Sequence, residues 1–167
     1  MKLLITTADT ITEWAGNVAA ACCTLLVALM FALVVARYCF GVGSIASQEL
    51  TQWLHGTAFL LALAYGLKYN SHVRVDIFSQ RWSKRHQALM EIVGIFIFLL
   101  PLCIFWCWVS FDYVAVSWSK NEGSNSGGLP GWFLIKTLIP LSAVLLILQA
   151  LANVVRSWQV FKSENKA

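Results

Sequence analysis

The stretch AGNVAAACCTLLVALMFALVVA, residues 15–36, decides the class of fold, because it runs for 22 residues without an acidic, basic or histidine side chain. A helix needs about 20 apolar residues to cross the hydrocarbon core of a bilayer. Three more windows, residues 50–67, 92–111 and 137–155, have the same character and together contain only one such side chain, His55. A backbone in lipid must satisfy its hydrogen bonds within its own segment. We therefore predict an all-α integral membrane protein with four transmembrane helices at these positions.

The composition excludes most other classes of protein. Hydrophobic residues make up 59% of the chain and charged residues 12%, against roughly 45–50% and about 25% in soluble domains. This balance excludes an ordinary soluble domain, a disordered chain and a secreted disulfide scaffold. The segments between the windows are too short to form a second core, so residues 1–167 are predicted to form a single domain.

The 12 lysines and arginines lie between the apolar windows instead of forming one basic stripe, which favours a role in membrane orientation over nucleic-acid binding. Nine of them fall beside the two termini and in the 68–91 connection, and three fall in or near the other two loops. The positive-inside rule predicts that both termini are cytoplasmic and that residues 37–49 and 112–136 face outward. The first window is longer than the apolar region of a signal peptide, so we expect residues 15–36 to stay in the mature protein.

Local signals predict where elements near the membrane surfaces begin. Thr10-x-x-Glu13 has the form of a capping box, which predicts that the first helix starts just before residue 15. Ser47 is the predicted N-cap of the second helix, which places Glu49 in its first turn. Residues 73–88 mix apolar and basic side chains. We expect them to form a short amphipathic segment that lies along the interface between the second and third helices.

No residue pattern indicates catalysis, a cofactor or a metal site. Cys103 and Cys107 share one helix face, but thiols in lipid without a neighbouring acid or histidine are typical of packing residues. His55 is the only histidine at membrane depth, so a haem held by two histidines is not expected. Pro101 and Pro140 can kink the third and fourth helices. We predict that the protein is not an enzyme and carries no cofactor.

The four windows also lack the acid or base at mid-membrane that transport of an ion or an anionic solute usually requires. The chain is therefore expected to act with a partner. Ala58, Ala62 and Gly66 recur at i, i+4 and i+8 and form a small-residue face on the second helix. The spacing leaves open whether this face packs against a partner or against the other helices of the chain. Two further functions stay open: a membrane-anchor subunit of a redox complex, and a self-sufficient small transporter, which the missing charges disfavour.

Several short motifs recur in a fixed order over roughly residues 10–155. They are SQELTQW at 47–53, HVRVDIF at 72–78, SWSKNEGS at 117–124, GGLP at 127–130 and KTLIP at 136–140. In this order and spacing they resemble the DctQ-like small membrane subunit, the Q subunit, of tripartite ATP-independent periplasmic (TRAP) transporters.

The resemblance implies an assembly of three proteins at the bacterial inner membrane. A periplasmic substrate-binding protein captures an organic anion, often a carboxylate or a sulfonate, and docks on a complex of Q with a large M subunit. The M subunit carries the substrate and sodium sites. The Q subunit is a non-catalytic scaffold, so sodium is expected on M and no cofactor is expected on the present chain.

The resemblance also implies roles for individual residues. Glu49 and Glu122 are expected at the outer face, where Q receives the binding protein or contacts M. Gln48 stands where many relatives have a second acid, so a role that requires paired acids is not expected. The candidates for the partner interface are Glu49, Trp53, Ala58, Ala62, Gly66, Glu122 and Pro130. The residues expected to stabilise the connection after the second helix are His72, Arg74 and Asp76.

Overall fold

In the computed structural model, which describes residues 2–71 and 82–163, every regular element is a helix. The all-α prediction is therefore confirmed. The elements are α1 (Lys2–Phe40), α2 (Ile45–Lys68), α4 (Lys84–Gly94), the π-helical turn η1 (Ile95–Leu99), α5 (Leu100–Ser119) and α6 (Trp132–Ser163). The segments α4, η1 and α5 run on as one helix, Lys84–Ser119.

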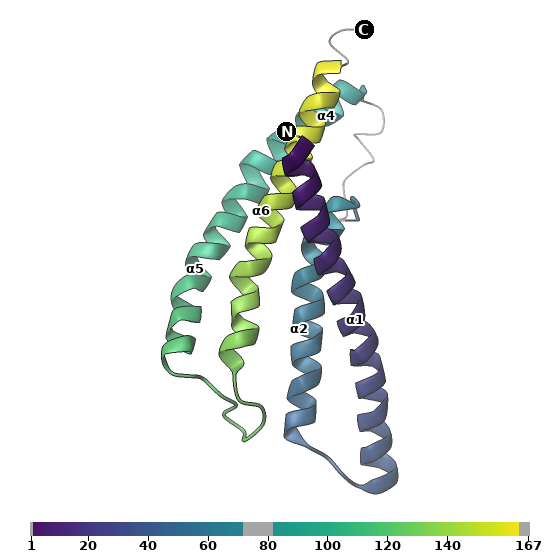
Figure 1. Ribbon diagram of the computed structural model, residues 1–167, viewed down its shortest axis with the longest axis vertical. Coiled ribbons are helices and arrows are strands. Elements are labelled where there is room, and N and C mark those ends of the chain that lie inside the picture. The colour runs from purple at the N-terminus through teal and green to yellow at the C-terminus, as the bar shows by residue number, and fades with distance from the viewer. Residues whose placement is uncertain (1, 72–81, 164–167) are drawn as a thin grey trace.

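The helices form two hairpins, α1 with α2 and α5 with α6 (Figure 1). The beginning of α1, the end of α6 and α4 lie at one end of the molecule, which we call the terminal end. The short loop between α1 and α2 and the longer loop between α5 and α6 lie at the other end, which we call the loop end. The predicted orientation, with both termini cytoplasmic, stays a prediction.

Three helices are long and apolar enough to cross a bilayer: α1, the continuous helix Lys84–Ser119, and α6. Each of them contains one predicted window. The fourth window lies inside α2, which does not reach the same apolarity because its first half carries polar side chains such as Gln52 and His55. Three spans are thus supported by length and composition, and a membrane-spanning position for α2 stays a prediction. Residues 73–81 of the expected interfacial segment lie outside the described residues, and residues 84–88 begin α4.

The π-helical turn has a clear cause in the sequence. Proline lacks an N–H group, and its ring clashes with the carbonyl group four residues earlier. Pro101 would clash with the carbonyl group of Ile97 in this way, and η1 ends two residues before Pro101. Within this turn the N–H of Leu100 reaches the carbonyl of Ile95, five residues back. The helix therefore adapts to Pro101 by local widening, and it continues to Ser119.

The central helix is α6. Of the residues in its most apolar window 44% are buried inside the chain, against 6% for α1 and 11% for Lys84–Ser119. The buried core where α1, α2 and α6 meet consists mostly of small side chains: Ala15, Ala19, Leu61, Ala64 and Leu145. Gly16 allows α1 to approach α2, because a Cβ atom there would overlap the ring of Tyr65. Such close approach through small residues is the usual way in which helices associate in lipid.

Both predicted helix starts were wrong. The helix α1 begins at Lys2, and the Thr10 hydroxyl donates to the carbonyl of Thr6 at 2.8 Å inside that helix. The helix α2 begins at Ile45 after Ser44, whose extended backbone places it at the N-cap. Glu49 therefore lies beyond the first turn of α2. Glu13 and Glu49 both bind parts of the chain that are distant in the sequence. A capping pattern considers only neighbouring residues, so it does not reveal such partners.

Candidate functional site

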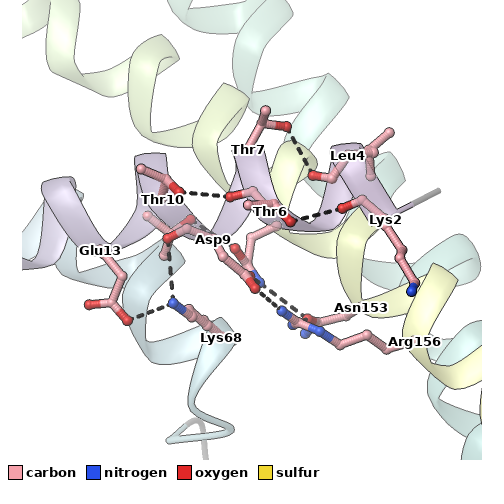
Figure 2. A network of polar contacts seen from close by, with 12 residues as sticks. Lys2, Leu4, Thr6, Thr7, Asp9, Thr10, Glu13, Lys68, Asn153 and Arg156 are labelled. Atoms are coloured by element: carbon pink, nitrogen blue, oxygen red, sulfur yellow. Dashed lines mark hydrogen bonds and ion pairs between the residues drawn. The ribbon is translucent and has the colours of Figure 1, made fainter.

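Charged side chains from three helices pair at the terminal end (Figure 2). Asp9 in α1 forms an ion pair with Arg156 in α6. Glu13, one turn further along α1, binds Lys68 Nζ of α2 at 2.6 Å. The hydroxyl of Tyr69 donates to the same carboxylate, which raises the pKa of Tyr69 to about 12 and keeps the phenol protonated. These contacts join α1 to both α2 and α6.

Buried amides continue this arrangement into the helix bundle. The Thr12 hydroxyl donates to Gln149 Oε1 at 2.8 Å, and both side chains are almost completely buried. Gln149 Nε2 donates to Asn153 Oδ1 at 3.2 Å and to Asp9 Oδ1 at 3.4 Å. Asn153 Nδ2 in turn donates to the carbonyl of Leu67 at 3.3 Å. An unpaired polar group in this position would be unfavourable, so the contacts select one mutual arrangement of α1, α2 and α6.

We call this set of side chains the terminal-end network. It comprises Asp9, Thr12, Glu13, Lys68, Gln149, Asn153 and Arg156.

Glu49 forms a second connection, at the loop end. Its side chain is buried, with 8% of the residue exposed. One carboxylate oxygen accepts from the Ser124 hydroxyl, and the other accepts from the backbone N–H of Leu129 at 2.7 Å. These donors hold the pKa of Glu49, which precedes the apolar window of α2, below its usual value. Gly128 leaves room for this carboxylate, because a Cβ atom there would overlap it.

Glu122 organises the start of the same loop. Asn121 ends α5 with a positive φ of 45°, and the N–H of Glu122 then donates to the carbonyl of Ser117 at 3.1 Å. The Glu122 carboxylate accepts from Lys136 Nζ at 2.5 Å and from the Ser117 hydroxyl at 2.6 Å. Lys136 and then Ser117 lower the pKa of Glu122. Lys136 also stands over the ring of Tyr113, 4.2 Å from its centroid, so one lysine joins the loop, α5 and α6.

An open cavity of about 500 Å³ lies beside these two acids at the loop end. Its lining comes from α2, α5, the loop and α6. Trp132, which begins α6, lines the cavity and meets Trp53 of α2 edge to face, with ring centroids 6.1 Å apart and an interplanar angle of 87°. The predicted candidates Glu49, Trp53 and Glu122 are thus brought to one region, while Pro130 is an exposed loop residue near them.

The small-residue face of α2 is divided between two environments. Ala58 is buried inside the chain with 4% exposure, Gly66 is half-buried, and Ala62 is exposed. The spacing left open whether this face packs against a partner or within the chain, and the structure gives a different answer for each residue. Ala58 packs within the chain, and Ala62 faces outward, where lipid or another protein can meet it.

The remaining candidate residues are those of the connection after α2, the histidine of α2 and the two cysteines of α5. His72, Arg74 and Asp76 lie outside the described residues. His55 is exposed on α2. Cys103 is buried, and the Cys107 thiol lies 3.8 Å from the carbonyl of Pro140, in agreement with a packing role. Over residues 2–71 and 82–163 there is no group of three or more histidine, cysteine, aspartate or glutamate side chains placed to hold a metal ion.

Most of the terminal-end network was not predicted from the sequence. Glu13 was interpreted as part of a capping box, Arg156 was counted only as a charge that orients the chain, and no role was predicted for Asp9. One signal could have identified α6 as the centre of such a network: Gln149 and Asn153 stand four residues apart on an otherwise apolar helix. Polar residues on one face of a membrane helix indicate hydrogen bonds to a neighbouring helix.

Comparison with known proteins gave one finding. Residues 26–160 match the family described as tripartite ATP-independent periplasmic transporters, DctQ component. No curated protein and no solved structure matches the chain. The matched range begins within α1 and ends within α6, so it covers Glu49, Glu122 and the α2 and α6 members of the terminal-end network.

Proposed function

This chain belongs to the DctQ component family of tripartite ATP-independent periplasmic transporters, and we propose that it is the non-catalytic scaffold subunit of such a transporter. The observation that carries this proposal is that the charged side chains of the chain pair with one another. The ion pairs of Asp9, Glu13 and Glu122 connect parts of this chain to one another. Side chains paired in this way hold the helices and the loop of the chain together, which is the role of a scaffold.

The complete proposal names the partners. The chain binds a large membrane subunit, M, which carries the substrate and sodium sites, and the complex receives a periplasmic substrate-binding protein. The solute is an organic anion, either a carboxylate or a sulfonate, and the sodium gradient drives its import. In this proposal α2 is the fourth transmembrane helix, the terminal end is cytoplasmic and the loop end faces the periplasm. Membership of a transporter family removes the reason to retain a redox anchor as an alternative.

The exposed faces of the helices support an accessory role. Large apolar side chains remain exposed along the second half of α1 and along α5, for example Phe31, Val34, Leu102, Phe105 and Trp108. A bundle whose outer helices bury so little of their surface internally offers broad apolar area to lipid and to another membrane protein.

Uptake by reconstituted components tests the proposal. Proteoliposomes with M, this chain and the binding protein should accumulate labelled solute when a sodium gradient is applied. Omission of this chain should reduce uptake to the level of liposomes without M, and its addition during reconstitution should restore uptake. Full uptake by M and the binding protein alone would contradict the scaffold role. Uptake by this chain alone would do so as well.

Two alanine substitutions on α2 separate packing within the chain from binding to the partner. Ala58→Leu should destabilise the subunit itself by about 1 kcal/mol, because added methylene groups have no room in a buried small-residue contact. Ala62→Leu should leave the stability of the isolated subunit unchanged, because Ala62 is exposed. It should reduce the amount of M that is recovered with the tagged subunit, because a small residue on an outward face permits close approach of another helix.

The two measurements are the unfolding midpoint of the purified subunit in detergent and the ratio of M to subunit after affinity purification. Val27→Leu on α1, at a site with 70% exposure, is the control for added bulk on an outward surface. Unchanged recovery of M with Ala62→Leu would indicate that this face meets lipid.

A further inference from the structure

The cavity at the loop end has a polar rim and an apolar floor. Its rim is lined by Glu49, by Glu122 and by loop residues up to Ser126. Its floor is lined by Leu60 of α2 and by Ile139 of α6. The helix rises about 1.5 Å per residue, so the cavity follows α6 for about 10 Å from Trp132 to Ile139.

The size of the cavity suits part of an amphiphilic molecule. A volume of about 500 Å³ falls within the range of small-molecule sites, roughly 300–1,000 Å³. Because the cavity is open and apolar residues of two helices line its floor, a lipid of the surrounding bilayer is a suitable occupant. Its change from charged rim to aliphatic floor matches the change from headgroup to acyl chain in a phospholipid.

The charges at the rim favour one kind of headgroup. Glu49 and Glu122 are carboxylates whose hydrogen-bond donors keep them ionised, and Lys136 is the one cation among the lining residues. Two carboxylates and one ammonium group give the rim a net charge of −1. Glu122 uses only its Oε2 atom in the contacts with Ser117 and Lys136, which leaves Oε1 for a further donor. An anionic headgroup would meet repulsion here, whereas a primary ammonium group would find an acceptor.

A donor for the phosphate group is also present. The indole Nε1 of Trp132 is buried and makes no hydrogen bond of normal geometry among the described residues, although it lies close enough to Glu49 to help lower the pKa of that carboxyl group. Trp132 lines the cavity near the level of the two acids. Buried indole N–H groups usually find a partner, and a phosphate oxygen is a strong acceptor. Lys136 provides a positive charge on the same helix, one turn away.

We propose that the loop-end cavity between α2, α5 and α6 binds a zwitterionic phospholipid with a primary ammonium headgroup, such as phosphatidylethanolamine. The ammonium group contacts Glu122, the phosphate group accepts from Trp132, and one acyl chain lies against Leu60 and Ile139. The bound lipid fills the space between the two hairpins and so supports their separation at the loop end. This inference goes beyond the scaffold role and does not depend on it, because all of the contacts come from the present chain.

Lipid retention by the full-length chain tests this inference. The chain is placed in nanodiscs with equal amounts of phosphatidylethanolamine and phosphatidylglycerol, and native mass spectrometry after release identifies the lipid that stays bound. Phosphatidylethanolamine should exceed phosphatidylglycerol by roughly fivefold, the size of one charge interaction at a membrane surface. Equal retention of the two lipids by the wild-type chain would overturn the proposal.

Matched variants locate the site. Ile139→Trp should fill the floor and remove the retained lipid, and Ile135→Phe offers a smaller filling change should the first variant fail to fold. Leu141→Trp is the control, because Leu141 lies on the same helix, outside the cavity and 43% exposed. Glu122→Gln should bring the ratio of the two lipids close to one, while Asp112→Asn, an exposed acid of α5 outside the cavity, should not change it. Lipid retention that is the same in folded Ile139→Trp and Leu141→Trp would place the lipid elsewhere and overturn the assignment.

Discussion

Replacement of Arg156 by methionine is expected to lower the free energy of unfolding of the subunit by about 2 kcal/mol. Arg156 donates through one guanidinium nitrogen to Asp9 and through the other to Asn153 Oδ1 at 2.9 Å. Without it, the Asp9 carboxylate keeps, among the residues that the structure describes, only the 3.4 Å contact from Gln149 and becomes a poorly compensated charge between helices. Loss of one partner in a fully buried pair costs about 3–5 kcal/mol. The effect should be smaller here because the Arg156 and Asp9 side chains are 35% and 25% exposed.

The measurement is equilibrium unfolding of the purified subunit in mixed micelles, followed by the fluorescence of its eight tryptophans. The double variant Asp9→Asn with Arg156→Met should recover a large part of the lost stability, because both charges are then absent. Lys162→Met is the control for loss of a positive charge near the end of the same helix, where the side chain is exposed. Equal destabilisation by Arg156→Met and Lys162→Met would indicate that the pair with Asp9 contributes nothing specific.

The sequence predicted the helices well, because length and apolarity decide whether a segment can cross a bilayer. All four windows lie inside observed helices, and a π-helical turn precedes Pro101, where a kink was predicted. The helix ends were predicted poorly. Apolar windows mark the hydrocarbon layer, and they do not show how far a helix continues beyond it. The first helix extends back to Lys2 because the acids on this extension find cations on α2 and α6.

The candidate site was predicted by residue but not by partner. Glu49 and Glu122 were expected at the outer face as residues of the partner interface. Both line one cavity at the loop end, and their role toward a partner stays a prediction. The partners of Glu49 could not be predicted, because Ser124 and Leu129 are about 80 residues away from it in the sequence. The small-residue spacing of α2 likewise suggested a single face. In the structure α2 turns so that Ala58 faces inward and Ala62 faces outward, and only the packing of neighbouring helices determines that rotation.

Replacement of Glu49 by alanine should release the loop between α5 and α6 from α2. The carboxylate accepts from both Ser124 and the N–H of Leu129, and no other contact described here joins these two residues to α2. The bond from the N–H of Ser124 to the carbonyl of Leu129 lies within the loop and should remain. We therefore expect a local effect. Amide hydrogen exchange at Leu129 should be faster by roughly tenfold or more, with little change along α6.

The matching change Glu49→Gln should preserve most of the protection at Leu129. The amide oxygen can still accept from the Leu129 N–H, and the amide nitrogen can donate to the Ser124 hydroxyl. Asp112→Ala, which removes an exposed acid of α5, is the control and should leave exchange at Leu129 unchanged. Exchange at Leu129 that is the same in Glu49→Ala and in the wild-type protein would show that the carboxylate does not hold the loop.

The Gln variant also isolates the effect of pH. The pKa of Glu49 is lower in the folded protein than its ordinary value of 4.5, because Ser124 and Leu129 donate to the ionised form. A carboxyl group of this kind adds stability that is fully present above the unfolded pKa and is lost as the pH falls through the folded pKa. Protection of Leu129 in the wild-type protein, relative to Glu49→Gln, should therefore be constant near neutral pH and decrease only below about pH 4.5. A ratio that already falls between pH 7 and pH 6 would assign the anchoring of the loop to a group other than Glu49.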